Sequence, residues 1–181
     1  MKALKLSVFL VSISLIVLSS CKRGEDDPFL PFSTRDARIT NEWKLTGSEG
    51  ITTQINVYDK TKIDRFNFDG TTMSEYHIDY FDNESEDSYP YSDSLSIKKD
   101  GTYQQKIEID ERTNTKTSRW VWYDSTKNKI GIMFEDGKIY FIQKLAKDEM
   151  VMYYKNSIVE TDADGNTTSS STTEYLSYSP F

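Results

Sequence analysis

From Ile39 onward, apolar side chains alternate with polar ones in short runs that are separated by turn signals. Trp43 and Leu45 fall on one face of an expected strand whose other face carries Glu42 and Lys44. Alternation with a period of two is typical of strands with one buried face, and helical periodicity is nearly absent from the chain. The pattern therefore predicts an all-β domain.

Four Asp-Gly pairs, at residues 69–70, 100–101, 136–137 and 164–165, separate several of these runs. Glycine tolerates the positive φ that tight hairpin turns require, and aspartate caps the neighbouring backbone. Ile55 and Val57 form a weak second strand in this interpretation. We expect the acidic, Ser-rich stretch 82–94 to be a loop and residues 111–117 to be a polar linker. About nine or ten strands joined mostly by hairpins predict an antiparallel meander that closes into a lipocalin-like β-barrel, with a β-sandwich as the alternative.

The start of the chain has the organisation of a signal peptide. Lys2 and Lys5 precede an uncharged segment of 13 residues, 6–18, which is shorter than the ~20 apolar residues of a spanning helix. Leu18-Ser19-Ser20-Cys21 ends this segment, and Cys21 is the only cysteine of the chain. This arrangement resembles the lipobox of bacterial lipoproteins. The resemblance implies cleavage before Cys21, a diacylglyceryl thioether on its sulfur and a fatty acyl group such as palmitate on its new amine; the alternative is an ordinary secretory signal.

Three segments follow from this assignment: a cleaved signal (1–20), a lipidated tether with an entry segment (21–38) and one barrel domain (39–181). The tether carries the acidic cluster Glu25-Asp26-Asp27, which resembles the surface-export signal of Bacteroidota lipoproteins. That resemblance implies a lipid-anchored protein displayed on the outer membrane. The alternatives are a simple charged linker and a domain that faces the periplasm.

Charge narrows the range of partners. Removing Lys2 and Lys5 from the 22 basic residues leaves 20 against 29 acidic ones, a formal charge of −9. Nucleic-acid binding depends on basic side chains that neutralise phosphates, so the balance argues against it. Docking on a membrane through a basic surface is also disfavoured, which leaves the lipid on Cys21 as the expected membrane attachment.

Two further stretches carry a family resemblance. They are Thr40-Asn41-Glu42-Trp43-Lys44-Leu45, as a first strand with its tryptophan, and Arg119-Trp120-Val121-Trp122. With the lipobox, the acidic tether and the segment 142–152, they resemble the lipocalin-like domains of Bacteroidota lipoproteins over residues 38–160. The resemblance implies a barrel carried by a cell-envelope lipoprotein.

The sequence offers few candidates for catalytic residues. The only histidine, His77, shares the polar face of its expected strand with Glu75 and Asp79, which favours a solvated position. No nucleophile elbow, zinc motif or phosphate-binding glycine loop is present. Asp162-x-Asp164-Gly165-Asn166 resembles the start of a calcium loop, but Thr173 stands at position 12, where such loops need Glu. We therefore predict no enzyme activity, no metal site and no cofactor.

Aromatic side chains are the remaining candidates for a binding site. Trp43, Trp120, Trp122 and Tyr123 could line a barrel interior for an apolar ligand, stack on sugars if exposed, or fill the core. The sequence thus predicts non-catalytic binding of a small apolar ligand by a cell-envelope lipoprotein. The alternative is a surface module that binds glycans or an envelope protein through exposed aromatics.

Overall fold

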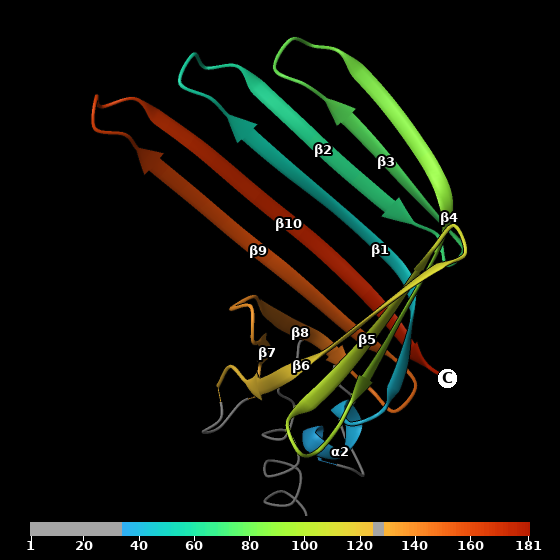
Figure 1. The fold of residues 1–181 in the computed structure, drawn as a ribbon. Coiled ribbons are helices and arrows are strands. Elements are labelled where there is room, and N and C mark those ends of the chain that lie inside the picture. The colour runs from blue at the N-terminus through green and yellow to red at the C-terminus, as the bar shows by residue number, and fades with distance from the viewer. Residues whose placement is uncertain (1–33, 125–128) are drawn as a thin grey trace, which may run out of the picture.

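The structure, a computed structural model, describes residues 34–124 and 129–181, which form a closed antiparallel β-barrel of ten strands (Figure 1). The strands are β1 (Glu42–Ile55), β2 (Thr61–Phe68), β3 (Thr72–Ile78), β4 (Glu84–Ile97), β5 (Thr102–Ile109), β6 (Arg112–Trp122), β7 (Gly131–Phe134), β8 (Ile139–Leu145), β9 (Met150–Thr161) and β10 (Thr167–Pro180). In the described chain the short helix α2 (Arg35–Ile39) precedes them. The prediction of an all-β meander that closes into a barrel is confirmed, and the sandwich alternative is not.

Each strand pairs with its neighbours in sequence, and β1 closes the ring against β10. β1 also pairs with β4, through Glu42 to Lys44 against Ser96 to Ser94. At the end of the barrel where these residues lie, β1 and β4 to β10 therefore form a tight ring without β2 and β3. Farther along β1, from Ser48 onward, β2 takes the place of β4 as the neighbour. The hairpin of β2 and β3 thus widens the barrel on one side.

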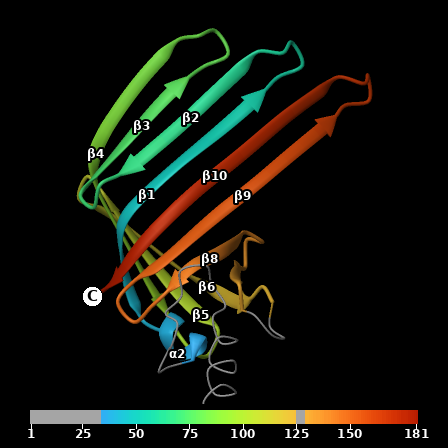
Figure 2. The same ribbon diagram turned by 180° about the vertical axis from the view of Figure 1, so that it is seen from behind.

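The strands differ greatly in length, which gives the barrel two unequal walls. β1, β4 and β10 each have 14 residues, whereas β7 has only 4. The long strands, with β2, β3 and β9, form a broad curved sheet, and β5 to β8 form a shorter wall that faces one end of it (Figures 1 and 2). A barrel of this shape is narrow at the end near α2 and open between its two walls.

The tightest packing lies at the narrow end. Ile39, Trp43, Ile132, Leu145 and Met150 are all fully buried there in one apolar cluster. Helix α2 is tied to the barrel by the Arg38 guanidinium, which donates to the Leu145 carbonyl, and by the Trp43 indole, which donates to the Ile39 carbonyl at 2.9 Å. These contacts hold the helix across the end of the barrel. No helix among the described residues is long and apolar enough to cross a membrane.

The Asp-Gly turns are where the sequence places them. Gly70, Gly101, Gly137 and Gly165 have φ values of 102°, 83°, 83° and 84°. In the last three turns the glycine donates to the carbonyl three residues earlier, and Asp59 and Asp82 occupy the equivalent position in two further turns, with φ of 58° and 62°. The same hairpin turn is therefore built with glycine in three places and with aspartate in two.

Because glycine and aspartate occupy the same position in these turns, we expect Gly137→Ala and Asp59→Gly to have opposite effects on the free energy of unfolding. No atom lies within 4 Å of a Cβ added at Gly137, so Gly137→Ala should cost only the strain of a left-handed backbone, about 1–2 kcal/mol. Asp59→Gly should relieve strain at the equivalent position and raise the free energy of unfolding by up to ~1 kcal/mol. Urea unfolding of both variants, followed by circular dichroism, checks the signs. Equal effects of the two changes would contradict the shared-turn interpretation.

The stretch 82–94 is not a loop, as the sequence suggested, because β4 runs through it from Glu84 to Ile97. Pro90 ends the pairing of β4 with β3, and Tyr91 begins its pairing with β5. The missing N–H of proline thus falls where β4 changes partner, and no interior ladder bond is lost. Two other boundaries also differ: residues 112–117 belong to β6, and Ile55 ends β1 while Val57 lies in a turn.

Candidate functional site: the barrel cavity

A cavity of about 400 Å³ lies between the two walls of the barrel. All ten strands contribute to its lining, which consists of Leu45, Ser48, Phe66, Met73, Glu75, Tyr89, Tyr91, Asp93, Leu95, Tyr103, Gln105, Lys116, Phe134, Asp136, Lys138, Tyr140, Met152, Glu174, Leu176 and Tyr178. Such a volume falls within the range of about 300–1,000 Å³ found for small-molecule sites. Twelve of these twenty residues are aromatic or aliphatic and eight are polar or charged, so the space is amphipathic.

Strand alternation explains most of the lining, and two local features complete it. A β-bulge between Leu45 and Gly47 shifts the alternation of β1, so that Leu45 and Ser48 both face inward. The ring of Phe66 lies over Gly50, so close that a Cβ at Gly50 would come within 2.2 Å of it. Glycine at that position is what allows the Phe66 ring to lie against the sheet and form part of the cavity wall.

Aromatic rings follow one another around the cavity. The ring centroids of Tyr103 and Phe134 are 4.5 Å apart, and those of Phe134 and Tyr140 are 5.7 Å apart. On the opposite wall, Tyr91 meets the core residue Phe68 edge to face at 5.3 Å. These contacts fix the positions of the rings, since offset and edge-to-face pairs are favoured geometries.

Two cavity carboxylates accept hydrogen bonds from tyrosines. The Tyr89 hydroxyl donates to Glu75 at 2.7 Å, and the Tyr140 hydroxyl donates to Glu174 at 3.0 Å. Burial, together with the bond to Glu75, raises the pKa of Tyr89 to about 12, and burial beside Glu174 raises the pKa of Tyr140 above its ordinary value. Both tyrosines therefore stay protonated as donors at neutral pH.

Charged side chains gather at the opening between the walls. Lys116 and Asp136 form an ion pair at 3.7 Å with side-chain exposures of 53% and 45%. Lys138 is 44% exposed and lies 3.7 Å from Glu174, whose side chain is mostly buried. The cavity thus has an exposed, mixed-charge mouth above a less exposed interior.

Asp93 lies deep in the cavity, with only 5% of its surface exposed. Its Oδ2 accepts a hydrogen bond from the Gln105 amide at 2.8 Å, whereas its Oδ1 has no hydrogen-bond partner among the described residues. Burial raises the pKa of Asp93 from 3.8 to about 6, against the opposing effect of the Gln105 bond. At neutral pH the cavity therefore holds a buried, mostly ionised carboxylate with one oxygen unsatisfied.

The three tryptophans singled out in the sequence lie near the α2 end and do not line this cavity. Trp43 is fully buried, Trp120 is buried and Trp122 is partly buried beside it, with ring centroids 5.5 Å apart. The Trp120 indole donates to the Lys98 carbonyl and the Trp122 indole to Asp36 of α2, at 3.1 and 2.7 Å. The structure places these side chains in packing and hydrogen bonding with the helix and its surroundings.

Tyr123 lies apart from the tryptophans, on the outer surface, where it is 49% exposed. It begins an outer aromatic row with Phe141, Tyr153 and Tyr175, in which successive ring centroids are 5.7, 5.4 and 6.1 Å apart. Tyr175 also borders an open depression of about 390 Å³ whose lining includes Ile51, Arg65, Asn67 and Tyr76. The exterior therefore offers a second aromatic surface.

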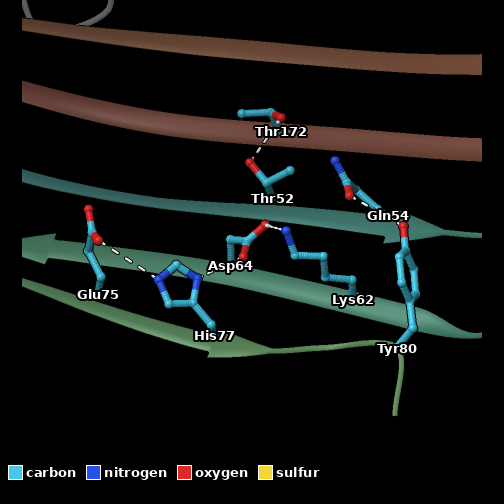
Figure 3. Close-up of polar contacts among 8 residues, drawn as sticks. All are labelled: Thr52, Gln54, Lys62, Asp64, Glu75, His77, Tyr80 and Thr172. Carbon is cyan, nitrogen blue, oxygen red and sulfur yellow. Dashed lines mark hydrogen bonds and ion pairs between the residues drawn. The ribbon is translucent and has the colours of Figure 1, made fainter. Parts of the chain in front are cut away.

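His77 lies on the broad sheet in a polar cluster (Figure 3). Its Nδ1 is 2.8 Å from Asp64 and its Nε2 is 3.8 Å from Glu75, as the expected sharing of a face between His77 and Glu75 requires. Burial would raise the pKa of Asp64, but hydrogen bonds with His77 and Lys62 lower it overall. Both ring nitrogens of His77 thus face carboxylates.

The cavity residues Tyr89, Tyr91 and Asp93 were missed because the sequence around them is acidic and rich in serine. The signal that could have found them is that residues 89, 91, 93 and 95 fall on one face of a strand, in a stretch that we expected to be a loop. The Asp162 segment is a hairpin turn: Asp162 accepts from the backbone N–H groups of Asp164 and Asn166. Cys21 and residues 1–33 lie outside the described part of the chain.

Comparison of the sequence with protein families, and of the chain with curated proteins and solved structures, gave no match.

Proposed function

We propose that this protein binds a small amphipathic molecule in the cavity of its barrel without transforming it. The observation that supports this proposal is the cavity of about 400 Å³, to which every strand contributes and whose lining combines aromatic and aliphatic side chains with eight polar or charged ones. A preformed space with a largely apolar wall and a small set of directed polar groups is the usual design of a ligand site. The sequence predicted an apolar ligand, but the lining also contains polar side chains, so we propose an amphipathic ligand instead.

The orientation of the ligand follows from the lining. Leu45, Leu95, Met152 and Leu176 supply apolar wall, while the exposed ion pair of Lys116 and Asp136 lies at the mouth. Buried apolar surface stabilises a complex by roughly 25 cal/mol per Å² before the costs of association are counted. The apolar part of the ligand would therefore lie against the aliphatic wall, inside the barrel.

The cellular setting is part of the same proposal. We infer from Leu18-Ser19-Ser20-Cys21 that a lipid on Cys21 holds the domain to the outer membrane of the cell envelope. Several acyl chains, at ~0.8 kcal/mol per buried methylene, would make that attachment durable. A barrel held in this way would take up its ligand beside the membrane surface.

Filling the cavity tests the binding proposal. Ser48 lies in the cavity wall and is buried, so the ring of Ser48→Phe would occupy part of the space. We expect native mass spectrometry of the purified full chain to show a reproducible extra mass that is lost on unfolding, and Ser48→Phe to reduce its occupancy at least about tenfold, since steric exclusion of ~1.4 kcal/mol already has that effect. Circular dichroism shows whether the variant keeps its fold.

Thr53→Phe is the matched control, because Thr53 lies on the same strand, β1, outside the cavity lining. Its ligand occupancy should equal that of the unchanged protein. A folded Ser48→Phe protein with undiminished occupancy would show that the ligand lies elsewhere. A bare polypeptide mass, together with no binding of added amphipathic probes, would overturn the proposal.

The outer aromatic row supports a second candidate function, the binding of glycans at the surface. Aromatic faces stack on sugar rings, and the depression beside Tyr175 adds the polar side chains Arg65 and Asn67. The two candidates are separable with the same variant. Ser48→Phe would leave a glycan site on the exterior unaffected, whereas it would abolish binding in the cavity.

A further inference from the structure

We propose that the cavity selects ligands that carry an ammonium group, which binds the Asp93 carboxylate deep inside the barrel. This inference rests on the proposed binding function and adds to it the chemical class of the ligand. It starts from the unsatisfied Oδ1 of a side chain that is 5% exposed and lines the cavity. A buried polar atom left without a partner costs about 1–3 kcal/mol, more when the group is charged.

Asp93 differs from the other carboxylates of the cavity. Glu75 accepts from Tyr89, Glu174 accepts from Tyr140 and lies near Lys138, and Asp136 is paired with Lys116. In the part of the chain that the structure describes, the only donor to Asp93 is the neutral amide of Gln105, on Oδ2. Among the cavity residues, the negative charge that lacks a cation or hydroxyl partner is therefore that of Asp93, and a ligand can supply one.

The surroundings of Asp93 favour a cation over a neutral donor. Tyr91 and Tyr178 lie close to Asp93. Burial raises the pKa of both tyrosines most, and the negative charge of Asp93 raises it further. Tyrosine rings attract ammonium groups through their electron-rich faces, and more strongly where water is excluded. A carboxylate among tyrosine rings thus combines the two interactions by which proteins hold organic ammonium ions.

The same charges disfavour an anionic ligand. Glu75, Asp93 and Glu174 all line the cavity, whereas its lysines, Lys116 and Lys138, are about half exposed and already lie beside acids. A carboxylate or phosphate head group placed beside Asp93 would meet repulsion without a buried cation to offset it. An anion that enters would have to keep its head group at the mouth.

Three probes of nearly equal shape test the selectivity: phenethylamine, phenethyl alcohol and hydrocinnamate, titrated into the purified full chain by calorimetry at pH 7.5. We expect the amine to bind about tenfold to a hundredfold more tightly than the alcohol, because a hydrogen bond to a charged group contributes about 1.5–3 kcal/mol. The carboxylate should bind most weakly. Asp93→Asn should remove the preference for the amine while the alcohol binds as before.

Asp164→Asn is the control for net charge, since Asp164 lies in the exposed turn between β9 and β10. It should leave the order of the three affinities unchanged. Equal affinity for amine and alcohol in the unchanged protein would overturn the role of Asp93 while leaving the binding function intact. Failure of all three probes to bind would count against the proposed function itself.

Discussion

Trp43→Ala should lower the free energy of unfolding by about 3–5 kcal/mol, the range for removing a fully buried large aromatic side chain. Trp43 is 0% exposed, and its indole N–H donates to the Ile39 carbonyl at 2.9 Å. Its strand position also pairs with both Leu95 of β4 and Pro180 of β10, where the tight ring of the barrel closes. The substitution would therefore open a cavity and remove one of the hydrogen bonds that tie α2 to the barrel.

The measurement is urea unfolding followed by far-ultraviolet circular dichroism, because tryptophan fluorescence would itself change with the substitution. Trp43→Phe keeps most of the packing and loses the hydrogen bond, so it should cost about 1–2 kcal/mol. Tyr123→Ala, at a half-exposed aromatic on the outer surface, should cost less than either. An equal loss for Trp43→Ala and Tyr123→Ala would show that Trp43 does not pack as described.

The fold was predictable because its signals are local. Each Asp-Gly turn needs only the residues in it, and all four glycines have the positive φ that the turn demands. The alternation of Trp43 and Leu45 with Glu42 and Lys44 likewise assigns the buried face of β1 without knowledge of its partners. A meander of hairpins leaves few ways to arrange such strands, so local signals were enough to indicate a barrel.

The cavity was not predictable in the same way, because it depends on which residues face one another across the barrel. Asp93 lies in a stretch with the composition of a loop, and only its pairing with Ile107 makes it a strand residue. The tryptophans were expected to be candidates on size and polarity, yet α2 and the Lys98 carbonyl meet their indole N–H groups. A five-residue helix is too short to show helical periodicity, so nothing in the sequence indicated that the tryptophans would contact a helix.

Asp93→Asn should make the protein more stable at alkaline pH and no more stable in acid. The pKa of Asp93 is about 6 in the folded protein and near the ordinary 3.8 when unfolded. The unfolded chain therefore loses its proton first, and between these two values stability falls as pH rises. Two pKa units correspond to about 3 kcal/mol, so above pH 7 the ionised Asp93 opposes folding by up to that amount.

Asparagine has the shape of the protonated acid and carries no charge, so the difference from the unchanged protein should vanish near pH 4 and reach about 2 kcal/mol at pH 8, allowing for an imperfectly paired amide. Tyr91 and Tyr178, whose pKa values burial and the Asp93 charge raise, do not titrate in this window. Urea unfolding at intervals from pH 4.5 to 8 measures the difference directly.

Asp64→Asn is the control of opposite sign, because hydrogen bonds from His77 and Lys62 lower the pKa of Asp64 and its ionised form supports folding. A pH-independent effect of Asp93→Asn would show that the carboxylate is not buried as described. If the stability gained by Asp93→Asn instead grows with pH as expected, while the variant loses its selectivity for phenethylamine, the same carboxylate is both a cost to folding and the recognition group for the ligand. That combination is what a binding residue produces when its partner arrives only with the ligand, since the charge is then unsatisfied in the unoccupied barrel and satisfied in the complex.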